Sequence, residues 1–173
     1  QNFVEYLTAR RIIPGIKVDQ GLEKFDNSDE TYTKGLDNLD TRLAEYYQMG
    51  LRFAKRRAAF EIHLDDNGNI ITPTDSTIEK NCQILSEYAK KCQSAGLVPI
   101  VEPELVYDGN YTIDQSAAIT GNILDRLFRT LQEANVNLGA CILKVNMVLA
   151  GKRYDQQSTP DEVGAKTAET LKN

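Results

Sequence analysis

The residue with the most distinctive chemistry is Lys144, which interrupts an otherwise apolar run at residues 139–148, Gly-Ala-Cys-Ile-Leu-Lys-Val-Asn-Met-Val. A run this short and apolar is typical of a strand covered on both faces. An ammonium in such a strand is costly unless it is paired or deprotonated. A lysine that loses its proton near neutral pH is a nucleophile, and with a carbonyl it forms a Schiff base. The alternative interpretation is a lysine at a strand end that reaches solvent.

Other charged side chains fall near the ends of three more apolar runs. They are Lys17 in residues 12–19, Lys55 and Arg57 in residues 53–62, and Glu102 and Glu104 in residues 97–105. In a strand the side-chain period is two, so Lys55 and Arg57 share a face, as do the two glutamates. Residues 53–62 also fit a helix by propensity, but the helical patterns on either side favour a strand. Pro99 and Pro103 argue weakly against a strand in the third run.

Together these groups suit carbonyl chemistry through a lysine imine. Lys55 would disfavour protonation of Lys144 by like-charge repulsion. Either glutamate could move protons as a carbinolamine loses water. Lys17 and Arg57 could hold a phosphate through charge-assisted hydrogen bonds.

The elements that must position these groups alternate along the chain. A short helix near residues 3–11 precedes four strand–helix units, and the polar residues 20–34 and 65–73 between them are predicted as loops. Helix starts are marked by capping boxes at Ser76, Thr112 and Thr159, and Gly96 marks a helix end. Alternating units predict a parallel sheet with right-handed crossovers. The carboxyl ends of such strands meet at one edge, where ligands bind.

Composition sets the class of protein. The chain has 173 residues, of which 41% are hydrophobic and 26% charged, which fits one globular domain. A net charge of −5 without a basic block argues against a nucleic-acid partner, and no apolar stretch is long enough for a membrane span. Cys82, Cys92 and Cys141 suggest free thiols in a reducing compartment, and no His/Cys/Asp spacing suits a metal.

The same segments resemble the class I fructose-bisphosphate aldolases. The similar segments are Pro-Gly-Ile-Lys-Val-Asp-Gln-Gly (14–21), Gly-Leu-Asp-Asn-Leu (35–39), Phe-Ala-Lys-Arg-Arg (53–57), Leu-Val-Pro-Ile-Val-Glu-Pro-Glu (97–104) and Leu-Lys-Val-Asn-Met-Val (143–148). They follow the family's order and span nearly the whole chain. The resemblance implies an α/β (β/α)₈ TIM barrel, of which residues 1–173 supply four consecutive central strand–helix units as part of a single domain.

The resemblance also implies roles for these residues in the reversible cleavage of fructose 1,6-bisphosphate. Lys144 would form the imine, Glu102 would be its acid/base, and Lys55 and Glu104 would be close partners. Lys17 and Arg57 would lie toward one phosphate of the sugar phosphate substrate. No metal and no cofactor is implied, and we expect a cytoplasmic homo-oligomer.

Some features depart from the family pattern. The family usually has tryptophan at the position of Arg56 and often proline at that of Val145, and neither position is expected to carry the chemistry. The family's aspartate on the first strand has no counterpart here. We therefore expect an excerpt of a longer enzyme. The alternatives are a non-catalytic half-barrel that binds a sugar phosphate or a partner chain, and a transaldolase-like enzyme.

Overall fold

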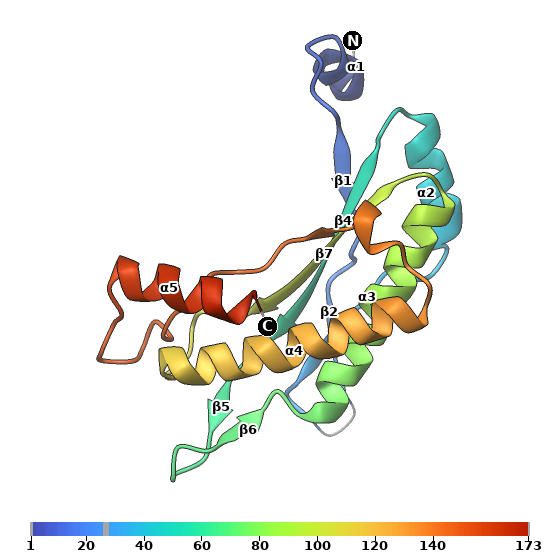
Figure 1. The fold of residues 1–173 in the computed structure, drawn as a ribbon. Helices are drawn as coiled ribbons and strands as arrows, with labels where there is room; N and C mark the ends of the chain where they lie inside the picture. Colours follow the sequence, from blue (N-terminus) through green and yellow to red (C-terminus); the bar gives the residue numbers. More distant parts are fainter. Residues whose placement is uncertain (1, 26–27, 173) are drawn as a thin grey trace.

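A parallel sheet of four strands forms the centre of the computed structural model, which describes residues 2–25 and 28–172. The strands lie in the order β1 (Gly15–Lys17), β4 (Phe53–Phe60), β7 (Val98–Leu105) and β8 (Ile142–Leu143), as Figure 1 shows. The longest pairing joins β4 to β7 along their whole length, from Phe53 opposite Val98 to Phe60 opposite Leu105. The predicted parallel sheet is confirmed.

The helices follow the predicted order. They are α1 (Phe3–Thr8), α2 (Leu39–Gln48), α3 (Asp75–Ser94), α4 (Ile113–Glu133) and α5 (Pro160–Thr170), with a short 3-10 turn η1 (Leu138–Ala140) before β8. The apolar stripes of α3 and α4 pack on β4 and β7, whereas α1 stands apart at the start of β1 (Figure 1). No helix in residues 2–25 or 28–172 is long and apolar enough to cross a membrane.

The two faces of the sheet differ sharply. On β4, the alternate residues Ala54, Arg56, Ala58 and Phe60 are fully buried beneath the helices. The residues between them, which include Lys55, point to the opposite face and are mostly only half-buried. We call this second face the open face. Because the side-chain period is two, β4 supplies alternate residues to the helices and the residues between them, including Lys55 and Arg57, to the open face.

Residues 20–34 contain a pair of strands and residues 65–73 contain one strand, so the prediction of loops was wrong there. Within residues 20–34, β2 (Leu22–Lys24) pairs antiparallel with β3 (Thr31–Thr33). After β4, β5 (His63–Leu64) pairs antiparallel with β6 (Ile70–Thr72). Every residue of β2 is exposed, so no apolar alternation marks it in the sequence. The first hairpin is held largely by backbone bonds, such as the one from the Gln20 N–H to the Lys34 carbonyl at 3.1 Å.

Helix capping agrees with the sequence at two of three starts. The boxes at Thr112 and Thr159 are confirmed, but the box predicted at Ser76 is wrong. Helix α3 begins two residues earlier, where the Thr74 hydroxyl accepts a hydrogen bond from the Thr77 N–H at 3.3 Å. Thr74 takes this position because Glu30 accepts bonds from its N–H and its hydroxyl, both at 2.7 Å.

The prolines of β7 lie in a central strand, contrary to the argument from their missing donors. Val98 and Val106 donate their N–H groups to β4-side carbonyls, so the even-numbered residues of this strand bond toward β4. Pro99 and Pro103 are odd-numbered, so the positions of their missing N–H groups point toward β8. Parallel pairing with β8 is only two residues long, so few ladder bonds are lost there.

The strand around Lys144 is shorter and less covered than its apolar sequence predicts. Only Ile142 and Leu143 pair with β7, and Ile142 is 48% exposed. Met147 and Val98 are also exposed. The expectation of a strand buried on both faces was wrong because helices cover one face only, and no described element lies over the open face.

We expect Thr74→Ala to lower the free energy of unfolding by about 1 kcal/mol, because it removes the α3 cap and a partner of Glu30. Ser76→Ala is the matched control and should change stability far less. Urea unfolding of both variants measures the difference. Equal losses in the two variants would contradict the observed cap.

We expect the 173-residue chain expressed alone to self-associate, because its open face exposes apolar side chains next to a short edge strand. Sedimentation velocity should show concentration-dependent oligomers. Ile142→Asn should reduce the association. Tyr107→Asn is the matched control and should not, because Tyr107 is also exposed but lies in the loop after β7. A monodisperse monomer at all concentrations would refute this expectation.

Candidate active site

The centre of the open face is the carboxylate of Glu102, which contacts two lysines at once. Lys55 donates to its Oε2 at 2.5 Å, and Lys144 donates to its Oε1. The Glu102 side chain is only 5% exposed, while that of Lys144 is 58% exposed. One buried carboxylate therefore joins three elements that are far apart in the sequence.

The electrostatics of this triad follow from its contacts. Burial raises the pKa of the Glu102 carboxyl, but the hydrogen bonds and charges of Lys144 and Lys55 outweigh it and hold that pKa below its usual value. The carboxylate is thus kept ionised, with one oxygen on each ammonium. The repulsion predicted between the two lysines is offset in this arrangement, because each has an opposite charge as its nearest neighbour.

The other predicted residues lie on the same face. Arg57 forms an ion pair with Glu104, with 2.9 Å between Nε and Oε2. Lys17 lies opposite Lys55 in the β1–β4 register and forms an ion pair with Asp19. The structure therefore brings all six predicted side chains to the open face, in two ion-paired clusters with Lys17 beside them.

The backbone explains how Lys144 reaches Glu102. The Lys144 N–H donates to the Val101 carbonyl at 2.9 Å, which fixes the lysine beside the residue that precedes Glu102. Two residues later, the Asn146 Oδ1 accepts a bond from the Leu105 N–H at 3.1 Å. Asn146 thus replaces a ladder bond and keeps the chain against β7.

Sequence reasoning missed Asp19 and Asn146 as members of this region. Asp19 follows Lys17 at the strand period of two, a spacing that would have shown that the two side chains can meet. Asn146 likewise follows Lys144 by two residues. Its role is a bond to the backbone, which no residue pattern in the sequence reveals.

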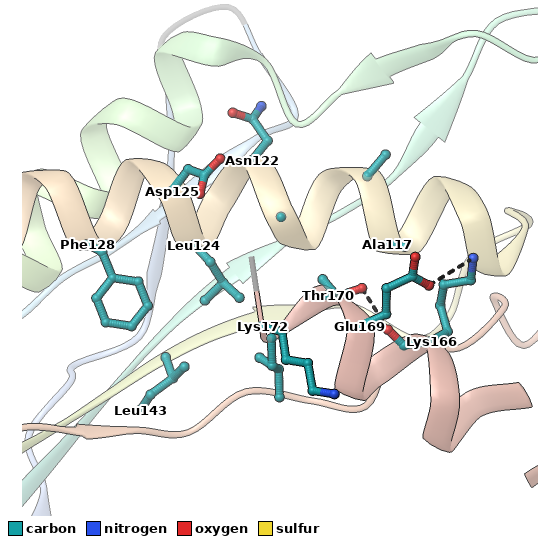
Figure 2. A pocket seen from close by; sticks show the side chains of 13 residues that line it. Ala117, Asn122, Leu124, Asp125, Phe128, Leu143, Lys166, Glu169, Thr170 and Lys172 are labelled. Atoms are coloured by element: carbon teal, nitrogen blue, oxygen red, sulfur yellow. Dashed lines mark hydrogen bonds and ion pairs between the residues drawn. The ribbon is translucent and has the colours of Figure 1, made fainter. Parts of the chain in front are cut away.

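A wide cavity lies elsewhere in the described structure. Figure 2 shows it between α4 and α5, near Phe128 and Leu143, with a volume of about 810 Å³. None of the six predicted site residues lines it, and Lys166 at its edge is already paired with Asp114 at 2.9 Å. We place the site at the Glu102 triad because chemistry requires convergent functional groups rather than volume.

The two buried thiols, Cys82 and Cys92, are poor candidates for a second site. Burial raises the pKa of the Cys82 and Cys92 thiols to about 12, which keeps them protonated and inert. In residues 2–25 and 28–172, no three His, Cys, Asp or Glu side chains come together in a way that could hold a metal ion.

Comparison with known proteins agrees with this geometry. Residues 1–173 match the family model described as fructose-bisphosphate aldolase class-I. The chain belongs to this family. It is 44% identical to a probable fructose-bisphosphate aldolase class 1 from Xanthomonas axonopodis pv. citri, over 99% of this chain and 50% of the relative. A fructose-bisphosphate aldolase from Dictyostelium discoideum is 41% identical over 98% of this chain and 46% of its own length.

A solved structure supports the fold. The chain superposes with a TM-score of 0.91 on a fructose-bisphosphate aldolase from Plasmodium falciparum, crystallised in complex with TRAP and a small-molecule inhibitor. That protein is 42% identical, and the match covers 98% of this chain and 48% of the other. The four parallel strands thus form part of a TIM barrel, as the sequence predicted. The chain spans about half the length of the relatives it matches.

We expect the ionised state of Glu102 to appear as acid sensitivity. Because its pKa is lowered in the folded state, the carboxylate stabilises the fold above the unfolded-state pKa of about 4.3. That contribution is lost as the pH falls through the lowered folded-state value. Urea unfolding between about pH 7 and about pH 3 should show a steeper loss of stability for the wild type than for Glu102→Gln. Glu104→Gln is the matched control: it leaves Glu102 and both of its lysines in place, so the contribution of Glu102 to the slope should remain.

Proposed function

We propose that this chain carries the imine-forming part of a class I fructose-bisphosphate aldolase, which cleaves fructose 1,6-bisphosphate reversibly to dihydroxyacetone phosphate and glyceraldehyde 3-phosphate. The observation that supports the proposal most directly is the contact between the Lys144 ammonium and the Glu102 carboxylate, with Lys55 on the second oxygen. A nucleophile and a proton acceptor in direct contact are what imine formation requires.

The proposed chemistry begins with a proton transfer. Lys144 passes a proton to Glu102 along their hydrogen bond, and the free amine adds to the ketone carbon of the substrate. The nitrogen proton moves to the former carbonyl oxygen, which gives a carbinolamine. Protonated Glu102 then donates to that hydroxyl, the C–O bond breaks, and water leaves as the C=N bond forms. The cationic imine serves as the electron sink for carbon–carbon cleavage, so no metal is needed.

The neighbouring residues have supporting roles in this proposal. Lys55 keeps the Glu102 carboxylate charged and in place, so that it is ready to accept the proton. Glu104 holds Arg57 by their ion pair. Arg57 and Lys17 both face the open side of the sheet and would bind one phosphate of the sugar through charge-assisted hydrogen bonds.

The wider setting follows from the family. We propose that residues 1–173 are part of a single barrel domain, and that the protein works in the cytoplasm as a homo-oligomer on a sugar phosphate. The open face is where further barrel strands would meet the triad, since the inward side chains of a barrel pack in layers.

Borohydride trapping tests the proposed role of Lys144. The complete protein, treated with dihydroxyacetone phosphate and borohydride, should carry the reduced adduct on Lys144, as mapped by peptide mass. Lys144→Met should abolish both the adduct and cleavage while leaving the fold largely intact, since methionine has a similar volume.

Lys55→Met is the matched control for position on the open face. It should slow cleavage yet still permit an adduct on Lys144. An adduct on Lys55 or Lys17 in the wild type would refute the assignment. The absence of any adduct would favour the non-catalytic half-barrel.

A further inference from the structure

The least expected side chain in the core is Arg56. It lies on the helix-covered face of β4, between Lys55 and Arg57, and it is 0% exposed. Its Nη2 donates to the Thr33 carbonyl at 2.5 Å, but its Nε and Nη1 are buried with no hydrogen-bond partner among the described residues. A buried guanidinium with two free donor nitrogens is costly unless a negative charge lies nearby.

A buried carboxylate oxygen in the same region also lacks a partner. The Asp19 side chain is only 6% exposed; its Oδ1 accepts from Lys17, whereas its Oδ2 is buried with no hydrogen bond within the described part of the chain. Buried acceptors, like buried donors, are normally satisfied by protein or by water. Arg56 thus has buried hydrogen-bond donors without an acceptor, and Asp19 has a buried acceptor without a donor.

Backbone contacts bring the two groups to one place. The Gln20 N–H, next to Asp19, donates to the Lys34 carbonyl at 3.1 Å, next to the Thr33 carbonyl that binds Arg56. Arg42 spans the same junction, since it donates to the carbonyls of Val18 at 3.1 Å and Gly35 at 2.6 Å. The residues on either side of Asp19 are thus packed on the segment that Arg56 holds.

Electrostatics point the same way. Burial lowers the pKa of the Arg56 guanidinium, and the charge of Asp19 opposes that change more than any other nearby charge does. No hydrogen bond joins these unpartnered atoms of Arg56 and Asp19 in the described structure, so a bridging water or a small side-chain rotation would complete the pair.

We propose that Arg56 is a positioning residue for the phosphate subsite: its positive charge beneath the sheet orients the Asp19 carboxylate, and Asp19 holds Lys17 on the open face. The inference rests on the proposed function, because that function gives Lys17 its phosphate. It assigns a purpose to a buried cation that the proposed reaction does not itself use. The pathway runs through the sheet, from a buried cation on one face to an exposed cation on the other.

Kinetics of the complete protein test the proposal. Arg56→Met, which removes the donors but keeps an apolar chain, should raise KM for fructose 1,6-bisphosphate about tenfold or more while kcat stays within about threefold. Arg56→Lys should recover part of the loss, because it restores a buried positive charge. In the Lys17→Met background, Arg56→Met should have no further effect on KM, since its action passes through Lys17.

Tyr88→Phe is the matched control for damage to the core. Tyr88 is buried on the same helix-covered side and donates its hydroxyl to the Ala54 carbonyl of β4 at 2.6 Å. Its loss should lower stability without a change in KM. If Tyr88→Phe raises KM as much as Arg56→Met, or if Arg56→Met still raises KM in the Lys17→Met background, the effect is general destabilisation and the proposal is wrong.

A binding measurement separates this inference from the proposed function. Titration calorimetry with inorganic phosphate should give weaker binding for Arg56→Met than for the wild type, with or without turnover. Wild-type protein that binds phosphate but does not cleave the sugar would refute the aldolase proposal alone. Equal phosphate affinity in the wild type and Arg56→Met would refute the role of Arg56 alone, and no phosphate binding to the wild type would refute both.

Discussion

A single buried carboxylate determines how the rest of this structure must be arranged. Glu102 lies in the middle of the sheet, where an unpaired negative charge would be strongly destabilising. It is tolerated because Lys55 from β4 and Lys144 from the β8 segment each occupy one of its oxygens. The long β4–β7 register and the bonds that anchor residues 144–146 serve this arrangement. A shift of one residue in either pairing would turn a lysine to the wrong face.

Because the sheet has two different faces, the same strands both pack against the helices and present the charged groups of the candidate site. The helix-covered face is built from small and apolar residues, and it holds the strands in register. The open face carries paired charges that need that register. Arg56 is the exception to this division, because it is a cation on the apolar side. In our proposal its charge acts on Asp19, which in turn forms an ion pair with Lys17 on the open face.

Much of this arrangement could be predicted from the sequence, because parallel strands impose simple rules. Charged residues of four apolar runs were expected to come together once helices alternated with the strands, and they do. They meet on the open face of the sheet rather than at its carboxyl edge, because Lys55 lies near the start of β4 and Glu102 in the middle of β7. The hairpin at β2 and β3 could not be predicted, because its stability comes from backbone bonds and from Thr33 rather than from an apolar pattern. The cap at Thr74 was missed because Glu30, distant in sequence, selects it.

The prediction for residues 139–148 failed for a different reason. Apolar composition indicates that a segment will be covered, but it does not say by which part of a molecule. In this chain the helices cover one side, so Ile142 and Met147 remain exposed. The prolines of β7 were misjudged because the side on which a missing donor falls depends on register, which composition does not encode.

The prolines also give the sheet an uneven stiffness. Glu102 lies in a strand tied to β4 along its full length, so its carboxylate rests on a rigid support. Lys144 lies where the backbone pairing with β7 ends, because Pro103 has no N–H to donate in the next interstrand hydrogen bond. Its segment is anchored to β7 at two points only, by the bond from the Lys144 N–H to the Val101 carbonyl and by the bond from the Leu105 N–H to Asn146. If the distance between the Lys144 and Glu102 side chains changes, we expect the segment that carries Lys144 to move while the strand that carries Glu102 stays in place.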